Sequence, residues 1–162
     1  MSKEIKDALR MMPYGFYSIT SRNENDENAM VANWISQASF DPQLIIFALQ
    51  KTSYSYGLIS EAKVFAVNIF LEEDSEAIKP LTKSRNKNPD KMKDVNFTHS
   101  TIVGCPVLDR AAAYLECEVD KIIDIGGDHD VVVAKVVGAG VKKPADAEEV
   151  LSLPDLGWSY AG

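Results

Sequence analysis

The sequence predicts a mainly β protein with short flanking helices. Runs of β-branched and aromatic residues recur along the chain, and turns that contain glycine, proline or asparagine separate them. No internal repeat, low-complexity segment or linker divides the chain, so all 162 residues are expected to form one domain. The expected strands cover Tyr14–Ser21, Leu44–Gln50, Val64–Leu71, Ala111–Asp124 and His129–Val141.

The first part of the chain predicts a helix and a strand hairpin. Residues Ser2–Met11 are expected to form a short helix that Pro13 stops. After the first strand, the asparagine-rich stretch Arg22–Asn28 predicts an irregular turn. Such a turn makes a hairpin, so Met30–Trp34 should run back along the first strand. The helix carries one apolar stripe, formed by Ile5, Leu9 and Met12.

The stretch Met30–Pro42 is too polar for a strand that only fills a core. It places the aromatic side chain of Trp34 among several amides and hydroxyls. This combination suits a flat ligand with a polar edge, because the ring face needs an apolar partner and the ring edge needs donors and acceptors. Asp41-Pro42 ends the stretch, and the buried strand Leu44–Gln50 follows. The polar segment is therefore expected to be a loop or a bulged strand that is held by the rigid strand Leu44–Gln50.

A second helix is expected after Leu44–Gln50, capped by Thr52 or Ser53 and continuing through Ala62 with Leu58 and Ile59 facing inward. The N-terminus of a helix behind two hydroxyls and a lysine favours a phosphate group. Capping alone would also explain the hydroxyls.

The most basic part of the chain is Lys79–Lys93, which follows a short acidic helix predicted over Glu72–Ile78. Its prolines and asparagines predict a loop with at most a helical turn. Most charge runs of this kind are solvated loops. The alternative is a lid that carries cations to an anionic ligand. The basic residues are Lys79, Lys83, Arg85, Lys87, Lys91 and Lys93.

The C-terminal part predicts a long hairpin. Phe97–Leu108 is expected to be irregular, and Gly126-Gly127-Asp128 is a tight turn between the last two strands. The valines of His129–Val141 predict burial on both faces, against the barrel or a second subunit. Lys142–Leu153 is expected to be a loop or short helix. The tail from Pro154 carries Trp158 and Tyr160, which should pack against the protein.

Composition excludes several classes of function. The chain is 46% hydrophobic and 25% charged, which is ordinary for a soluble globular protein. Its net charge of −7 argues against nucleic-acid binding and against binding to anionic lipids. No stretch is long enough to span a bilayer, and no signal peptide is visible, so no membrane association is expected.

The cysteines and histidines do not form a metal site. Cys105 and Cys117 lack the spacing of a Cys-x-x-Cys motif and are expected to be buried thiols, which fits a cytoplasmic protein. Two histidines with scattered carboxylates offer no metal cluster. The nucleophile elbow, the phosphate-binding loop with its lysine and the Rossmann glycine motif are all missing from the sequence.

Residues Asn28–Leu49 resemble the signature of the flavin reductase-like family, whose members bind FMN in a split β-barrel. The family pattern runs small-Met-Thr-Ala-Asn-Trp, a polar pair, Ser, then Pro and an apolar strand. Ala29 replaces the usual glycine, and Val31 replaces a threonine whose hydroxyl could contact the flavin. Weaker similarity in the expected order extends from Ala8-Leu9-Arg10 to the C-terminal residues 156–162.

The resemblance implies an FMN-binding split β-barrel with flanking helices that forms a homodimer. It places His129 near the reactive face of the flavin, for hydrogen bonding or acid–base work. It implies that the isoalloxazine ring contacts Met30, Val31, Ala32, Asn33 and Trp34. The ribityl chain and phosphate would contact Ser36, Gln37, Ala38 and Ser39. Further phosphate candidates are Thr52, Ser53, Lys83, Ser84 and Arg85.

The implied reaction is hydride transfer from NADH or NADPH to the bound flavin, which then reduces a second acceptor such as free flavin, ferric iron or a partner protein. The missing Rossmann motif is compatible with this, because members of the family hold the nicotinamide against the flavin. Two alternatives remain open. One is an FMN electron carrier with little NAD(P)H activity of its own, and the other is a non-flavin module that binds another planar ligand on the same barrel.

Overall fold

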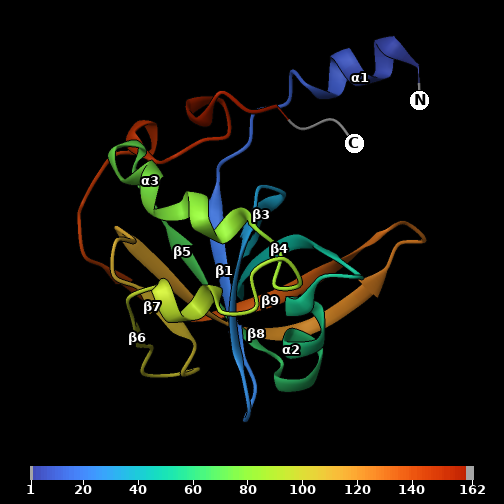
Figure 1. The fold of residues 1–162 in the computed structure, drawn as a ribbon. Coiled ribbons are helices and arrows are strands. Elements are labelled where there is room, and N and C mark those ends of the chain that lie inside the picture. The colour runs from blue at the N-terminus through green and yellow to red at the C-terminus, as the bar shows by residue number, and fades with distance from the viewer. Residues whose placement is uncertain (1, 160–162) are drawn as a thin grey trace.

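The computed structural model describes residues 2–159 and has a seven-stranded antiparallel sheet as its main element (Figure 1). The strands follow the order β2-β1-β5-β8-β9-β4-β3 across the sheet. They are β1 (Tyr17–Arg22), β2 (Glu27–Ala32), β3 (Ile35–Phe40), β4 (Gln43–Gln50), β5 (Val64–Ile69), β8 (Ala113–Asp124) and β9 (His129–Val141).

The sheet closes into a split barrel because its two edge strands are consecutive in the chain. Only Asn33 and Trp34 lie between the end of β2 and the start of β3. A link of this length spans at most about 11 Å, so the two edges come close at this end without forming a ladder. The predicted split barrel is therefore confirmed, and the split lies between β2 and β3.

Helices flank the barrel, as the sequence predicts. α2 (Tyr54–Ala62) begins at Ser53, whose hydroxyl caps it by accepting the N–H of Tyr56 at 3.2 Å. Leu58 and Ile59 on this helix are buried, as expected. The other α-helices are α1 (Lys3–Leu9) and α3 (Ser75–Ile78). Short 3₁₀ helices cover Glu72–Asp74, Lys79–Thr82, Lys91–Asp94, Ala147–Glu149 and Pro154–Leu156.

The two larger apolar clusters support most of the fold. One fills the barrel, where the rings of Phe47 and Phe65 meet at 5.0 Å between centroids. The other lies outside the barrel under α3 and the C-terminal segment, and it includes Phe16, Phe70 and Leu81. This second cluster fixes the chain that follows α3 against β2. The barrel split and the basic segment are thereby brought together.

The segment Phe97–Leu108 differs from the expected irregular connection. It contains two short paired strands, β6 (Phe97–His99) and β7 (Pro106–Leu108). A buried Asn68 amide on β5 accepts the N–H of Leu108 at 2.8 Å, which fastens β7 to the barrel. The sequence pattern misses these strands because each is only three residues long and depends on this distant contact.

Two apolar surfaces stay partly open in this chain. On α1, Ile5 and Met12 of the predicted stripe are half exposed. On β9, Val132 and Ala134 are fully buried while the opposite face is only half-buried, so this chain alone does not bury both faces. Cys105 and Cys117 are free and buried as predicted, and burial raises the pKa of each thiol to about 12. Across residues 2–159, no helix has the length and apolarity needed to cross a membrane.

The carboxylate of Asp74 is buried and joins three segments of the chain. Lys143 donates to it at 2.9 Å and the Nε of Arg110 at 3.0 Å. The hydrogen bonds from Lys143 and then Arg110 hold the pKa of Asp74 below its ordinary value of 3.8. The carboxylate therefore stabilises the fold above that pH, and this stabilisation is lost as the pH falls below 3.8.

We expect Asp74→Asn to lower the free energy of unfolding by about 2 kcal/mol at pH 7, because hydrogen bonds to a charged group are lost. Urea unfolding at pH 7 and at pH 3 measures this, and the difference from the wild type should shrink at the lower pH. Asp90→Asn is the matched control, because Asp90 is exposed and its ion pair with Lys93 is exposed as well. Equal stability of wild type and Asp74→Asn at pH 7 would contradict this account.

Candidate functional site

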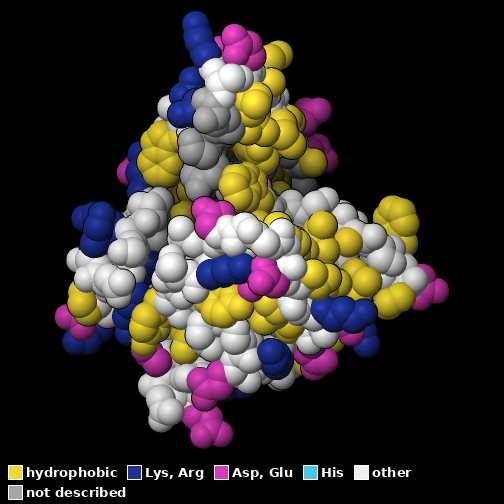
Figure 2. All heavy atoms as spheres, turned by 90° about the vertical axis from the view of Figure 1, so that its right-hand side faces the viewer, with side chains coloured by type: hydrophobic (Ala, Val, Ile, Leu, Met, Phe, Trp, Pro, Cys, Tyr) yellow, Lys and Arg dark blue, Asp and Glu magenta, His cyan; other side chains and the backbone are white. Residues whose placement is uncertain are grey.

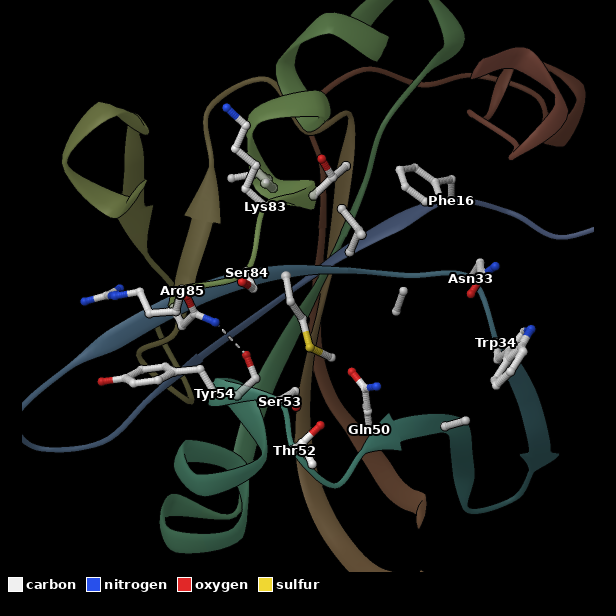
Figure 3. A pocket seen from close by; sticks show the side chains of 18 of the residues that line it. Phe16, Asn33, Trp34, Gln50, Thr52, Ser53, Tyr54, Lys83, Ser84 and Arg85 are labelled. Atoms are coloured by element: carbon white, nitrogen blue, oxygen red, sulfur yellow. Dashed lines mark hydrogen bonds between the residues drawn. The ribbon is translucent and has the colours of Figure 1, made fainter. Parts of the chain in front are cut away.

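A pocket of about 680 Å³ opens at the barrel split (Figure 3). Its walls come from the end of β2 and the Asn33–Trp34 link, the end of β4, the start of α2, the segment 81–86, the first residue of β9 and the C-terminal tail. The predicted residues that line it are Met30, Val31, Ala32, Asn33, Trp34, Thr52, Ser53, Lys83, Ser84, Arg85 and His129.

One side of the pocket is an aromatic wall. The rings of Trp34 and His129 lie 5.1 Å apart at 57°. The carbonyl of Trp34 accepts the N–H of Ala48 at 3.0 Å, which holds the two-residue link against β4. The Nδ1 of His129 lies 2.8 Å from a carboxylate oxygen of Asp128, and this contact lowers the pKa of Asp128. Nε2 is therefore the ring nitrogen of His129 that a ligand can use.

The opposite side of the pocket is the N-terminus of α2. Thr52 and Ser53 line the pocket there, and Ser53 is the N-cap residue. The first N–H groups of a helix have no partner inside the helix, and their dipoles favour an anion. Capping by Ser53 and anion binding by the N–H groups are compatible, because the hydroxyl serves only the N–H of Tyr56.

The predicted cations Lys83 and Arg85 line the pocket, and in Figure 3 the side chain of Lys83 extends away from α2 while that of Arg85 runs beside Tyr54, the first residue of the helix. The guanidinium of Arg85 donates to the carbonyl of Glu27 at 2.9 Å and to Asp26 at 3.1 Å. It also lies over the ring of Tyr54, 5.2 Å from the centroid. A bound anion would have to compete with Asp26 for this guanidinium.

Lys91 was expected to be one of several solvated lysines, and this expectation is wrong. Its side chain is 3% exposed and lines the pocket. Its Nζ donates to the carbonyls of Leu81 at 3.1 Å and Lys83 at 2.8 Å, and these bonds hold the backbone of the pocket-lining segment in place. Burial, assisted by the charge of Arg85, lowers the pKa of Lys91 to about 8. The sequence contains no signal for this, because a charge run does not reveal which member turns inward.

Asn28 is a second pocket residue that sequence reasoning missed. It was assigned to a turn, but it lies in β2, two residues before Met30. It is buried, and its Nδ2 donates to the hydroxyl of buried Ser55 in the first turn of α2 at 2.9 Å. Its Oδ1 is buried without a hydrogen-bond partner among residues 2–159. The alternation of Asn28, Met30 and Ala32 at strand spacing was the signal that could have placed it on this face.

Four predicted residues do not line the pocket. Ser36, Gln37, Ala38 and Ser39 lie on β3, which carries the expected bulge, between Gln37 and Ser39. Three of them are exposed to solvent. On the tail, Trp158 lines the pocket and packs edge-on against Phe16, with centroids 5.8 Å apart. Tyr160 lies outside the described residues.

Comparisons with known proteins identify the family. The model described as flavin reductase like domain matches residues 9–158. Relatives include the reductase subunit HsaB of a flavin-dependent monooxygenase from Rhodococcus jostii, 32% identical over 134 residues that cover 83% of this chain and 66% of that protein. Diflavin flavoprotein A 1 of Synechocystis is 31% identical over 144 residues, which are 88% of this chain. The chain spans only about a quarter of the diflavin flavoproteins that it matches.

Solved structures have the same fold. Nitrilotriacetate monooxygenase component B from Mycobacterium thermoresistibile superposes with a TM-score of 0.79 at 25% identity, covering 93% of this chain and 85% of that one. The flavin reductase HpaC, solved with NADP⁺, gives a TM-score of 0.76 at 23% identity, covering 90% of both chains.

The buried amine of Lys91 predicts a pH dependence of stability. Below pH 8 it is charged in both the folded and unfolded states, and burial of the charge opposes folding. Between pH 8 and about 10.5 it loses its proton only in the folded state, so this cost is relieved as the pH rises.

We therefore expect the stability of the wild type relative to Lys91→Met to increase between pH 8 and 10.5. Urea unfolding of both proteins across this range measures the difference. Lys93→Met, which removes an exposed lysine of the same segment, should show no such gain. If the difference in stability between the wild type and Lys91→Met does not change with pH, the burial of a charged amine at this position is refuted.

Proposed function

The chain belongs to the family of flavin reductase-like domains, and we propose that it binds FMN and transfers a hydride from NADH or NADPH to the bound flavin. The family and the reductases among its relatives and neighbours confirm the expected class of oxidoreductase. The observation that carries the finer proposal is the pocket at the barrel split, with an aromatic wall on one side and a helix N-terminus on the other.

The residues present fit FMN, which is a flat ring joined by a polyol chain to a phosphate. Met30 and Trp34 offer apolar surface to the ring, while the N-terminus of α2 behind Ser53 offers N–H groups to the phosphate. Asn28 and Ser55 also line the pocket, and the hydrogen bond between them at 2.9 Å ties β2 to the first turn of α2. When bound, FMN supplies the hydride-accepting ring.

The chain's own residues orient the ligands and exclude water. The Trp34 and His129 rings close one wall, so that the reacting centre would lie against apolar surface. The Nε2 of His129 is available to hold a polar group of the ring or the nicotinamide. The neighbour HpaC was solved with NADP⁺, which supports a nicotinamide as the donor.

The phosphate must be captured against an unfavourable background, because the net charge is −7. The α2 N-terminus would supply fixed donors, and Lys83 and Arg85, which also line the pocket, would supply charge. Arg85 already pairs with Asp26, so it can add to phosphate binding only the free energy by which its contact with the phosphate exceeds that ion pair.

We also propose a cytoplasmic homodimer. The β8–β9 hairpin exposes Ile123, Ile125 and Val141 and leaves Val131 and Val133 half-buried. Figure 2 views the molecule from the side toward which this hairpin points and shows hydrophobic side chains exposed over that face. Exposed apolar side chains on a protruding hairpin favour an interface between subunits.

The direct test is an absorption spectrum of the protein loaded with FMN, before and after anaerobic addition of NADH or NADPH. We expect flavin absorption that bleaches, because the ring accepts a hydride. If the absorption persists with both nicotinamides but bleaches with a protein donor, the protein is an electron carrier and not a reductase. If the protein does not bind FMN, the remaining alternative is a barrel that binds another planar ligand.

The double variant Lys83→Ala/Arg85→Ala tests how much these two cations contribute to binding the phosphate of FMN. We expect FMN to bind about tenfold more weakly, because charge-assisted hydrogen bonds to the phosphate are lost. Riboflavin, which lacks the phosphate, should bind as before. The control Lys87→Ala/Lys93→Ala removes two exposed charges of the same segment that do not line the pocket. Unchanged FMN affinity in the first double variant would rule out the role of both cations.

A further inference from the structure

Gln50 presents an exposed amide to the pocket from the side of β4 and β9. It is the last residue of β4, and its side chain is open to solvent. Figure 3 shows this side chain extending from the end of the strand into the space between Thr52 and Trp34. Among residues 2–159 the amide forms no hydrogen bond, while the backbone carbonyl of Gln50 accepts the N–H of Ser53 at 3.0 Å. The backbone is therefore fixed, and a ligand can reach both the donor and the acceptor of the amide.

Gln50 lies beside His129. The two residues are direct partners in the antiparallel β4–β9 ladder, so their side chains project from the same face of the sheet with Cβ atoms about 5 Å apart. The ring of His129 packs against that of Trp34, with 5.1 Å between centroids. The N–H of Lys51 donates to the carbonyl of Asp128 at 3.1 Å, which joins the ends of the two strands. The amide and the imidazole therefore form one polar edge of the aromatic wall.

The partner of His129 determines what this polar edge offers. The carboxylate of Asp128 can only accept, so the Nδ1 of His129, 2.8 Å away, carries the proton in this contact. In the neutral imidazole, Nε2 then accepts a hydrogen bond. The NH2 group of Gln50 adds a donor beside it. One acceptor and one donor side by side complement a primary carboxamide, whose NH2 group donates and whose oxygen accepts.

Two ligands of the proposed reaction carry chemistry of this kind. The nicotinamide ring of NADH or NADPH bears a primary carboxamide, and the flavin ring has an imide edge with neighbouring N–H and C=O groups. The exposure of Gln50 favours the nicotinamide. A donor that enters and leaves in every turnover meets the open side of the pocket, whereas a flavin held through turnover occupies the deeper surface at Met30 and Ala32.

We propose that Gln50, together with His129, binds the carboxamide of the nicotinamide and thereby orients that ring. This inference rests on the proposed function, because it names the group of the hydride donor that the pocket recognises. A site that hydrogen-bonds a polar group of its substrate discriminates against analogues that lack the group. Gln50 would therefore be a specificity-determining residue, and it lies outside the sequence motif around Trp34.

The test variant is Gln50→Leu, because leucine is of similar size and cannot form hydrogen bonds. The purified full chain loaded with FMN is mixed anaerobically with increasing concentrations of whichever nicotinamide reduces the wild type. The bleaching of flavin absorption gives the dissociation constant of the donor and the limiting rate. We expect this dissociation constant to rise about tenfold, because one hydrogen bond to the carboxamide is lost. The affinity for FMN, measured by fluorescence quenching, should not change.

A donor whose carboxamide oxygen is replaced by sulfur gives a sharper comparison, because sulfur is a weak acceptor. Wild type and Gln50→Leu should bind this thioamide equally. Gln50→Glu keeps the size of the side chain but lacks the NH2 donor, so it should lose at least as much affinity for the carboxamide as Gln50→Leu. The matched control is Gln43→Leu, which changes an exposed glutamine at the other end of β4 that does not line the pocket and should leave every constant unchanged.

Three results would overturn the inference alone. A lower affinity of Gln50→Leu for FMN would assign the amide to the imide edge of the flavin. Equal losses for the carboxamide and the thioamide would make the role of Gln50 structural. Unchanged constants in both Gln50 variants would leave its amide without a ligand. All three require a wild type that NADH or NADPH reduces. A wild type that neither nicotinamide reduces would overturn the proposed function, and this inference with it.

Discussion

The two-residue link between β2 and β3 is the constraint on which the site depends. Asn33 and Trp34 bring the two edges of the sheet close at one end, and β2 and β3 do not pair with each other. The backbone bond from Ala48 to Trp34 then sets the link against β4. The barrel therefore has an opening at the point where the sequence carries its aromatic and amide side chains. A longer link would allow the edges to separate, and the aromatic wall would lose its position.

The pocket wall contains local arrangements that oppose stability. Lys91 buries an amine at the segment that lines the pocket, and the Oδ1 of Asn28 has no hydrogen-bond partner within residues 2–159. Elsewhere, Asp74 and Asn68 are matched by several hydrogen bonds, whereas the buried hydroxyl of Ser21 has no partner among the described residues. Unpartnered polar groups therefore occur both at the pocket and outside it, and the pocket wall is marked by the buried amine of Lys91.

The cations of the pocket wall are already engaged in part by other groups of the chain. The chain is acidic overall, yet the segment after α3 brings cations to the pocket. Asp26 and Tyr54 hold the guanidinium of Arg85 at the rim, while Lys91 clamps the backbone of the same segment through the carbonyls of Leu81 and Lys83. An anionic ligand would therefore meet a wall whose backbone is fixed and whose charges are partly engaged. This arrangement limits the affinity for phosphate alone and gives weight to neutral contacts along the ligand.

The sequence by itself determined the fold class, the capped helix α2, the β8–β9 hairpin and the motif around Trp34, because these depend on local turn chemistry, capping and strand periodicity. It also indicated most of the residues that line the pocket, through their resemblance to a family. Only the tertiary structure decided that Lys91 turns inward, that Asn28 is buried at the pocket and bonded to Ser55, that Ser36–Ser39 lie outside the pocket and that Arg85 is engaged by Asp26. Each of these depends on contacts between segments far apart in the chain, and no local pattern encodes which side chain meets which neighbour across the barrel.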